Sequence, residues 1–145
     1  MAISRRCLHG DACRRPSIAR RRCVDDADCV LEELDGIKLR HAIEPRHESF
    51  RDDAFIDLCR DHNVAVVYDH DDEFPCIDAD TADFRYARLQ RMSEDVPTGY
   101  DASALDGFAE QAKSWAAKGD AYIFMINGAK VRAPAAAVAL QERLA

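Results

Sequence analysis

Val-Ala-Val-Val-Tyr, residues 64–68, is an uninterrupted apolar run that ends abruptly at Asp-His-Asp. A continuous run of this kind is typical of a strand buried in a parallel sheet. Three more apolar stretches stop at a charged or amide side chain, namely residues 41–43 before Glu44, residues 84–87 before Arg88 and residues 122–126 before Asn127. Ligand-handling residues of α/β proteins lie at the carboxyl ends of strands, so the pattern indicates where a site would lie without naming its reaction.

Helical patterns separate the apolar runs. Residues 105–116 repeat apolar side chains at helical spacing, with Asp101 as the expected N-cap and Gly119 as the stop. A last helix is expected to start at Pro134, because proline is favoured in a first turn. Strands that alternate with helices predict an α/β fold with a parallel sheet.

Two further helices and one alternative turn carry weaker signals. Ser49 and Asp52 resemble a capping box for a helix that ends near Asn63. Residues 30–34 are interpreted as the end of a short helix that stops at Gly36. Asn127-Gly128 leaves a β-hairpin open as an alternative, but the residues that follow are short and charged and run into a proline.

Length and charge limit the classes of protein that fit. At 145 residues the chain is long enough for one domain with a core, and no apolar stretch reaches the length of a membrane span. Residues 1–23 hold seven arginines and one acid, whereas the rest holds thirteen basic and twenty-six acidic residues. An acidic body disfavours nucleic acid, and no membrane association is expected.

The first 30 residues differ from the remainder. They lack periodicity and are rich in arginine and cysteine, so a disordered tail is expected there. Its charge leaves RNA or an acidic lipid surface open as a partner, although no aromatic residue is interleaved for base stacking. A zinc site fits poorly because the cysteine spacings are too wide. A shifted reading frame or an upstream start would also explain such a tail. Arginines interrupt any signal peptide, so cytoplasmic localisation and reduced cysteines are expected.

Three motifs carry a family resemblance. They are Leu-Arg-His-Ala-Ile-Glu-Pro-Arg-His-Glu-Ser-Phe at residues 39–50, Thr-Ala-Asp-Phe-Arg-Tyr-Ala-Arg-Leu at residues 81–89, and Tyr-Ile-Phe-Met-Ile-Asn-Gly at residues 122–128 with the Arg-Ala-Pro that follows. In this order they resemble the YecE-like family, domain of unknown function 72. The likeness covers about residues 36–145. Departures are Phe50 in place of a tryptophan, Gln90-Arg91 in place of His-Gly, and glycine in place of a second asparagine.

The resemblance implies a (β/α) barrel of the triosephosphate isomerase type, of which residues 31–145 look like the C-terminal half. A complete barrel takes about 250 residues, so a partial barrel and a truncated protein are expected. The strand over residues 39–46 is then expected at an edge, with the face that fills a whole barrel open to water. Self-association, pairing with a separately encoded N-terminal half, or marginal stability would follow.

Five residues are predicted for the site. Glu44 and Asp69 are the catalytic candidates, and Arg46, Arg88 and Asn127 are the candidates for substrate binding. Alternate residues of a strand point the same way, so Arg46 is expected to clamp an anion that Glu44 orients or deprotonates. A buried structural ion pair is the alternative for these two.

The other candidates also have a structural alternative. Arg88 either faces the barrel mouth or snorkels outward along the sheet edge. Asn127 either binds a ligand or caps the turn after its strand. Residues 69–73 resemble a hard-metal site by composition, but a solvated loop is the commoner reading and no metal site is predicted. Cys59 is expected in the core.

The hypothesis of an enzyme is that these side chains meet at one mouth and act on a small anionic or polar substrate, such as a phosphate or carbohydrate derivative. The competing hypothesis is a non-catalytic fragment or interaction module with no activity of its own. No cofactor is predicted, and the sequence lacks the glycine-rich loop that binds the phosphates of a nucleotide. The nucleophile-elbow pattern of serine hydrolases is also absent.

Overall fold

The computed structural model describes residues 33–126 and 128–145, and the chain divides into two compact units, residues 1–39 and 40–145. The expected tail over residues 1–30 and the side chain of Asn127 therefore lie outside the described residues. No helix in the described part of the chain has the length and apolar character needed to cross a bilayer.

In the first unit the described residues form a short hairpin. Strands β1 (Glu33–Leu34) and β2 (Ile37–Lys38) pair antiparallel. Asp35 and Gly36 between them have φ values of 54° and 79°, as a type I′ turn requires. The helix expected to end at Gly36 is therefore wrong at residues 33 and 34, because this glycine serves a hairpin turn instead.

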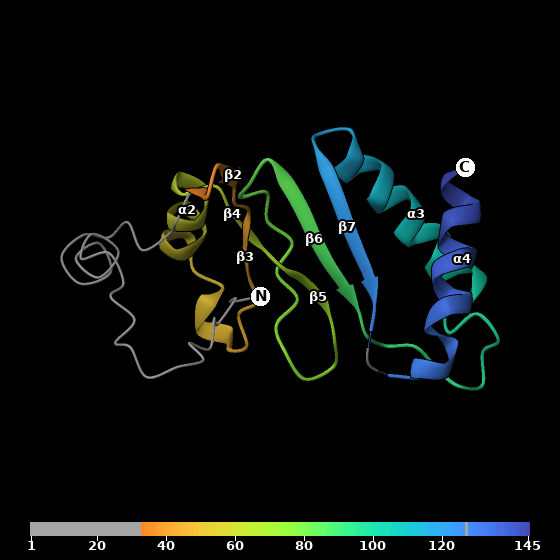
Figure 1. The fold of residues 1–145 in the computed structure, drawn as a ribbon. Coiled ribbons are helices and arrows are strands. Elements are labelled where there is room, and N and C mark those ends of the chain that lie inside the picture. Colours follow the sequence, from red (N-terminus) through yellow and green to blue (C-terminus); the bar gives the residue numbers. More distant parts are fainter. Residues whose placement is uncertain (1–32, 127) are drawn as a thin grey trace, which may run out of the picture. The chain divides into compact units, whose positions relative to one another are not determined.

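The second unit contains a two-stranded and a three-stranded parallel sheet, and in both the strand order follows the sequence (Figure 1). Its strands are β3 (His41–Ile43), β4 (Val64–Val66), β5 (Tyr68–His70), β6 (Phe84–Leu89) and β7 (Asp120–Met125). β3 pairs with β4, β5 with β6, and β6 with β7, all in parallel. The N–H of Val67, between β4 and β5, donates to the carbonyl of Ile43 at 2.9 Å. Residues 64–70 thus form one nearly continuous strand that pairs with β3 on one side and with β6 on the other, which joins the two sheets into one. The predicted parallel α/β fold is confirmed, although the described strands form an open sheet rather than a closed barrel.

Three helices pack on one face of this sheet, which we call the helix-covered face. They are α2 (Asp53–Asp61), α3 (Ala102–Ala116) and α4 (Ala133–Leu144). α2 packs on β4 around Val66 and Cys59, so the thiol lies in a core cluster as expected. α3 and α4 pack on β7 and on each other around the buried Leu89 and Leu105 (Figure 1).

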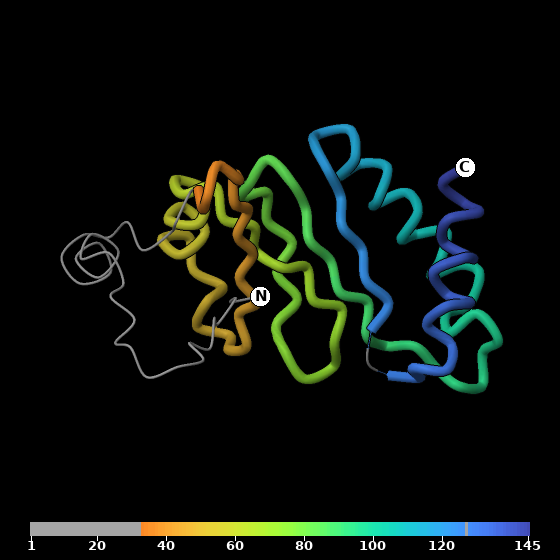
Figure 2. Tube along the Cα trace, viewed as in Figure 1, coloured from red at the N-terminus to blue at the C-terminus, as the bar shows by residue number. Residues whose placement is uncertain are grey.

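A loop takes the place of a helix between β5 and β6. Figure 2 shows the chain reversing after β5 and running back to the start of β6. Residues 71–83, all of which are described, contain no helix. Ile77 and Ala79 of this loop nevertheless pack into the cluster beneath α2. Coil therefore covers the part of the helix-covered face between α2 and α3.

The helix ends show which sequence signals were read correctly. Asp101 caps α3 by accepting from the N–H of Ala104 at 2.8 Å, as predicted. Asp52, not Ser49, caps α2, because its carboxylate accepts from two N–H groups of the first turn. Ser49 lies instead in a 3₁₀ turn, Glu48–Phe50, and contacts His47. Asn63, with φ of 51°, ends the helix region as predicted.

Two glycines mark positions that exclude a side chain. A Cβ on Gly119 would overlap the carbonyl oxygen of Asp83, so glycine lets the turn after α3 pass close to the start of β6. Gly128 has φ of 49°. The chain then enters a second 3₁₀ turn, Lys130–Arg132, and α4. The alternative hairpin after Asn127 is therefore wrong.

Aromatic side chains occupy the opposite, helix-free face of the sheet. Tyr86 and Phe124 stack with ring centroids 4.9 Å apart, and Phe84 meets Tyr122 edge-on at 6.0 Å. Tyr122 and Phe124 each expose 41% of their surface. Because none of the three helices packs here, this face remains open over β7.

Candidate functional site

Glu44 bridges two guanidinium groups, one from the loop after β3 and one from β6. It follows β3 directly, and its Oε1 accepts from Arg46 Nε at 2.9 Å and Nη2 at 2.7 Å. Its Oε2 accepts from Nη1 of Arg88, near the carboxyl end of β6. The carboxylate therefore holds both arginines at the carboxyl ends of the strands, which we call the mouth.

The two arginines differ in exposure. The side chain of Arg88 is 20% exposed and that of Arg46 is 59% exposed. The guanidinium of Arg46 also lies over the ring of Phe74, 4.7 Å from its centroid. This cation–π contact joins the mouth to the loop after β5 and orients Arg46 without using its N–H donors.

Asp69 lies on the same face as Arg88, its register partner across β5 and β6. Its Oδ1 accepts from Nε2 of Gln90, while Oδ2 is buried and has no hydrogen-bond partner among the described residues. Burial raises the pKa of this carboxyl, and the charge of Glu44 adds to the rise, while Gln90 and Arg88 oppose it. The Asp69 carboxyl, with its raised pKa, therefore holds its proton more firmly than an exposed aspartate does.

The next residue illustrates the alternation of the strand. His70 lies on the helix-covered face, between the rings of Tyr100 and Phe108. Burial lowers its pKa, with Arg91 as a second cause, so the neutral imidazole is favoured. His70 is therefore part of the core side of the sheet and does not reach the mouth.

Four of the five predicted site residues lie at the mouth, namely Glu44, Arg46, Asp69 and Arg88. With Gln90 they form what we call the mouth cluster. Glu44 and Arg46 do form the ion pair of the structural alternative. That pair is not fully buried, because the Arg46 side chain is exposed, and Arg88 joins it as a second arginine. Asn127 lies outside the described residues. Within residues 33–126 and 128–145, no group of three or more His, Cys, Asp or Glu is placed to hold a metal ion.

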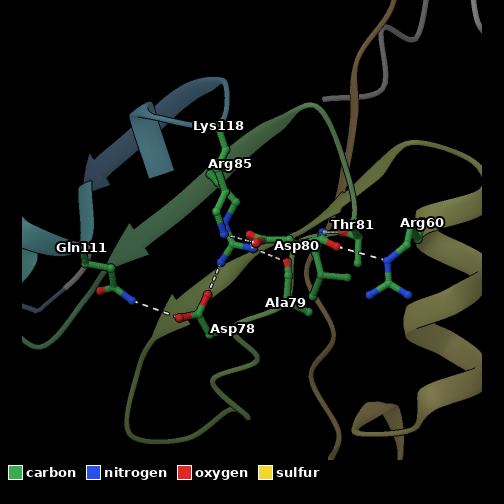
Figure 3. Close-up of polar contacts among 9 residues, drawn as sticks. Arg60, Asp78, Ala79, Asp80, Thr81, Arg85, Gln111 and Lys118 are labelled. Carbon is green, nitrogen blue, oxygen red and sulfur yellow. Dashed lines mark hydrogen bonds and ion pairs between the residues drawn. The ribbon is translucent and has the colours of Figure 1, made fainter. Parts of the chain in front are cut away.

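A second polar cluster lies on the helix-covered face of β6 (Figure 3). Arg85 is 5% exposed and donates to the carboxylates of Asp78 and Asp80 and to the carbonyl of Ala79. Its guanidinium also lies over the ring of Trp115, 5.1 Å from the centroid. We call Arg85, Asp78, Asp80 and the carbonyl of Ala79 the Arg85 clamp, because they fasten the loop to the strand that follows it.

Neighbouring elements extend the clamp. Gln111 of α3 donates to Asp78 at 3.1 Å, and Lys118 pairs with Asp80 (Figure 3). The adjoining Thr81 accepts from the N–H of Val66 at 2.9 Å. These contacts fasten the loop to α3 and β4 as well. The buried charge of Arg85 is thus neutralised by carboxylates that remain half exposed.

Sequence reasoning missed two members of this chemistry. Arg85 lies between Phe84 and Tyr86, so strand alternation places it on the opposite face, where a lone charge signals a buried partner. Gln90 appears in the sequence analysis only as a departure from the family motif and not as a site residue. Its position directly after β6 is the signal that was available.

Comparison with known proteins supports a family but no activity. The family model described as "Protein of unknown function DUF72" matches residues 15–145, which is most of the chain. It starts earlier than residue 36, where the likeness seen in the sequence begins. No curated protein and no solved structure matches the chain. The chain belongs to the DUF72 family.

Proposed function

We propose that this member of the DUF72 family binds a small anionic or polar molecule at the mouth cluster, as part of a YecE-like (β/α) barrel. The observation that supports it most directly is the bridging of Arg46 and Arg88 by Glu44. Two guanidiniums at one place attract carboxylate or phosphate, and arginine can bind either in a bidentate manner.

The barrel-like part of the proposal rests on topology and on contacts across the helix-free face. Parallel strands in sequence order with helices on one face are the arrangement of a (β/α) barrel. Arg40, just before β3, donates to Asp120 at 2.6 Å and to Tyr122 at 3.1 Å, although β3 and β7 are the outermost strands of the sheet. Side chains stand roughly perpendicular to a flat sheet, so such contacts favour a concave face.

The arginines have donors left for a ligand. A guanidinium carries five N–H donors, and Glu44 engages Nε and Nη2 of Arg46 and Nη1 of Arg88. Glu44 is held in place by this double contact, which suits it to positioning the arginines. Counted without Asp69, the two arginines and Glu44 carry one net positive charge at the mouth.

Asp69 is the group best suited to transfer a proton. A raised pKa and an unpaired buried Oδ2 are features that suit a carboxyl to proton donation. We assign it the role of a general acid toward a substrate anchored by the arginines. The reaction class that fits is protonation of a leaving or carbonyl oxygen on an anionic substrate.

Titration with inorganic phosphate tests the binding step. We expect calorimetry to give millimolar affinity for the wild type and at least tenfold weaker binding for Arg88→Met. Arg143→Met removes the same charge from α4, where Arg143 pairs with Asp106 away from the mouth, and serves as the matched control. Equal affinity in both variants, or no binding by the wild type, would contradict the proposal.

The competing function is an interaction module without activity. The open aromatic face of β7, with Tyr122 and Phe124 exposed, favours it. This hypothesis expects association with another protein surface and no measurable phosphate binding. The titration above therefore separates the two.

A further inference from the structure

The parallel sheet has an unpaired strand at each side. Among residues 40–126 and 128–145, β3 pairs with β4 alone and β7 pairs with β6 alone. Unpaired edges carry free backbone N–H and C=O groups that readily bind another strand. With β4 and β5 counted as one continuous strand, four parallel strands lie between these two edges.

The side chains of the helix-free face also lack a complete cover. Tyr122 and Phe124 on β7 remain exposed, whereas Phe84 on β6 is only 4% exposed. Two exposed aromatic side chains beside an open edge would be covered if another chain packed there. The uncovered part thus lies toward the β7 edge, where a further strand would add.

We propose that two copies of this chain associate about a two-fold axis parallel to the strands, with β3 of each copy beside β7 of the other. This inference rests on the proposal that the sheet is part of a (β/α) barrel, and it does not depend on the binding of an anion at the mouth cluster. Rotation about such an axis keeps every strand parallel, and it gives a closed interface with two identical seams. Two sets of four strands make eight, the number at which barrel side chains fill the interior.

Charges at the two edges are complementary in this arrangement. Arg40 precedes β3 and Asp120 opens β7, so both lie at the amino ends of the edge strands. They form an ion pair within one chain across the concave face, which places them at a similar height. In the two-fold arrangement each seam brings Arg40 of one copy toward Asp120 of the other. Neither seam therefore brings like charges of these two residues together.

Association would also complete the mouth. The carboxyl ends of all eight strands would face the same way, so each mouth cluster would lie on one ring with that of the second copy. The aromatic side chains of both helix-free faces would fill the space between them. The second copy would thus supply the other four strands of the ring.

Charge exchange between the edges tests this geometry directly. We expect sedimentation under reducing conditions to show wild-type dimers of twice the 16.3 kDa chain mass at micromolar concentration. Arg40→Asp and Asp120→Arg should each weaken the dimer at least tenfold, because each creates like charges at both seams. An equimolar mixture of the two should restore a heterodimer, because both seams then pair opposite charges.

The mixture separates contacts between copies from contacts within one chain. In either single variant the internal Arg40–Asp120 pair stays broken, so only contacts between copies can account for recovery. A wild-type monomer at 100 µM, or a mixture no tighter than its components, would overturn the inference. The wild-type measurement decides the matter even if one variant does not fold. Phosphate binding by a monomer would leave the proposed ligand site intact while this inference failed.

Discussion

Arg85 and Arg88 lie three residues apart on β6, and each contacts carboxylates, yet they belong to regions of different character. Arg85 faces the helices and is almost fully buried, with its partners in the loop directly before its own strand. Arg88 faces the helix-free side and reaches Glu44, 44 residues away in sequence. The first arginine fastens a local loop, whereas the second joins separate strands at an open edge of the sheet.

Whether an arginine can bind a ligand depends on how many of its N–H donors remain accessible, more than on how many acidic residues it contacts. The clamp supplies Arg85 with two carboxylates, a carbonyl and an aromatic ring, all from within the fold. A cavity of about 50 Å³ beside it, lined partly by Phe84, Lys118 and Gly119, has room for little more than water. At the mouth, Arg46 and Arg88 share one carboxylate; Arg46 is largely exposed and Arg88 is partly exposed. Structure is thus the expected role of the clamp, and binding that of the mouth.

The largest expected effect comes from removing the buried arginine. Arg85→Met should lower the free energy of unfolding by about 3 kcal/mol, because it strips the clamp of its cation and leaves the carbonyl of Ala79 unpaired. Arg88→Met should lower it by about 1 kcal/mol or less, since its site is partly solvated. Urea unfolding followed by circular dichroism gives both values. Similar losses in the two variants would erase the distinction between the regions.

Neutralising one acid in each region should have a smaller effect, which concerns phosphate affinity and appears at the mouth and not at the clamp. Glu44→Gln releases both mouth arginines from a negative charge, so phosphate should bind about threefold to tenfold more tightly, equivalent to roughly 0.7–1.4 kcal/mol. Asp80→Asn, the matched change in the clamp, should leave phosphate affinity within twofold. Calorimetric titration measures both. Weaker binding by Glu44→Gln would mean that the carboxylate, not the arginines, makes the main contact with the ligand.

The smallest expected effect is a pH dependence that originates at Asp69. Its folded pKa is raised above the ordinary 3.8, so the folded state holds this proton more firmly than the unfolded state. The stabilising contribution is full below pH 3.8 and is lost as pH rises through the raised folded pKa. Asp69→Asn should remove this decline, and Asp106→Asn on the exposed face of α3 should not. Unfolding curves at a series of pH values decide it, and parallel curves for all three proteins would refute the assignment.

Much of the second unit was predictable because its signals are local. Residues 64–68 are apolar without interruption, and Asp101 followed by helical spacing marks the start of α3. The proximity of Glu44, Arg46, Asp69 and Arg88 was predictable because parallel strands place their carboxyl ends at one edge. Such inferences need only the neighbouring residues and the sense of the strand.

The remaining features could not be predicted, because a segment fits two local structures equally well or because a contact joins residues distant in sequence. Ser49 and Asp52 both suit an N-cap, and the 3₁₀ turn at Glu48–Phe50 gives that position to Asp52. Asp35-Gly36 was read as the end of a helix although it is also a hairpin signal. The bridging of Arg46 and Arg88 by Glu44 joins residues far apart in sequence. No local pattern specifies such a contact, because it depends on how the sheet curves.

The coil that replaces a helix between β5 and β6 also offers a place to alter the protein. Asp72 and Glu73 are exposed at the tip of this loop, while the Arg85 clamp holds its other end to β6. Exposed loop tips accept inserted sequence better than regular elements do. A small reporter peptide spliced between these two residues would stand close to Phe74 and hence to Arg46. The loop can therefore carry a probe to the mouth without a change to any strand or helix.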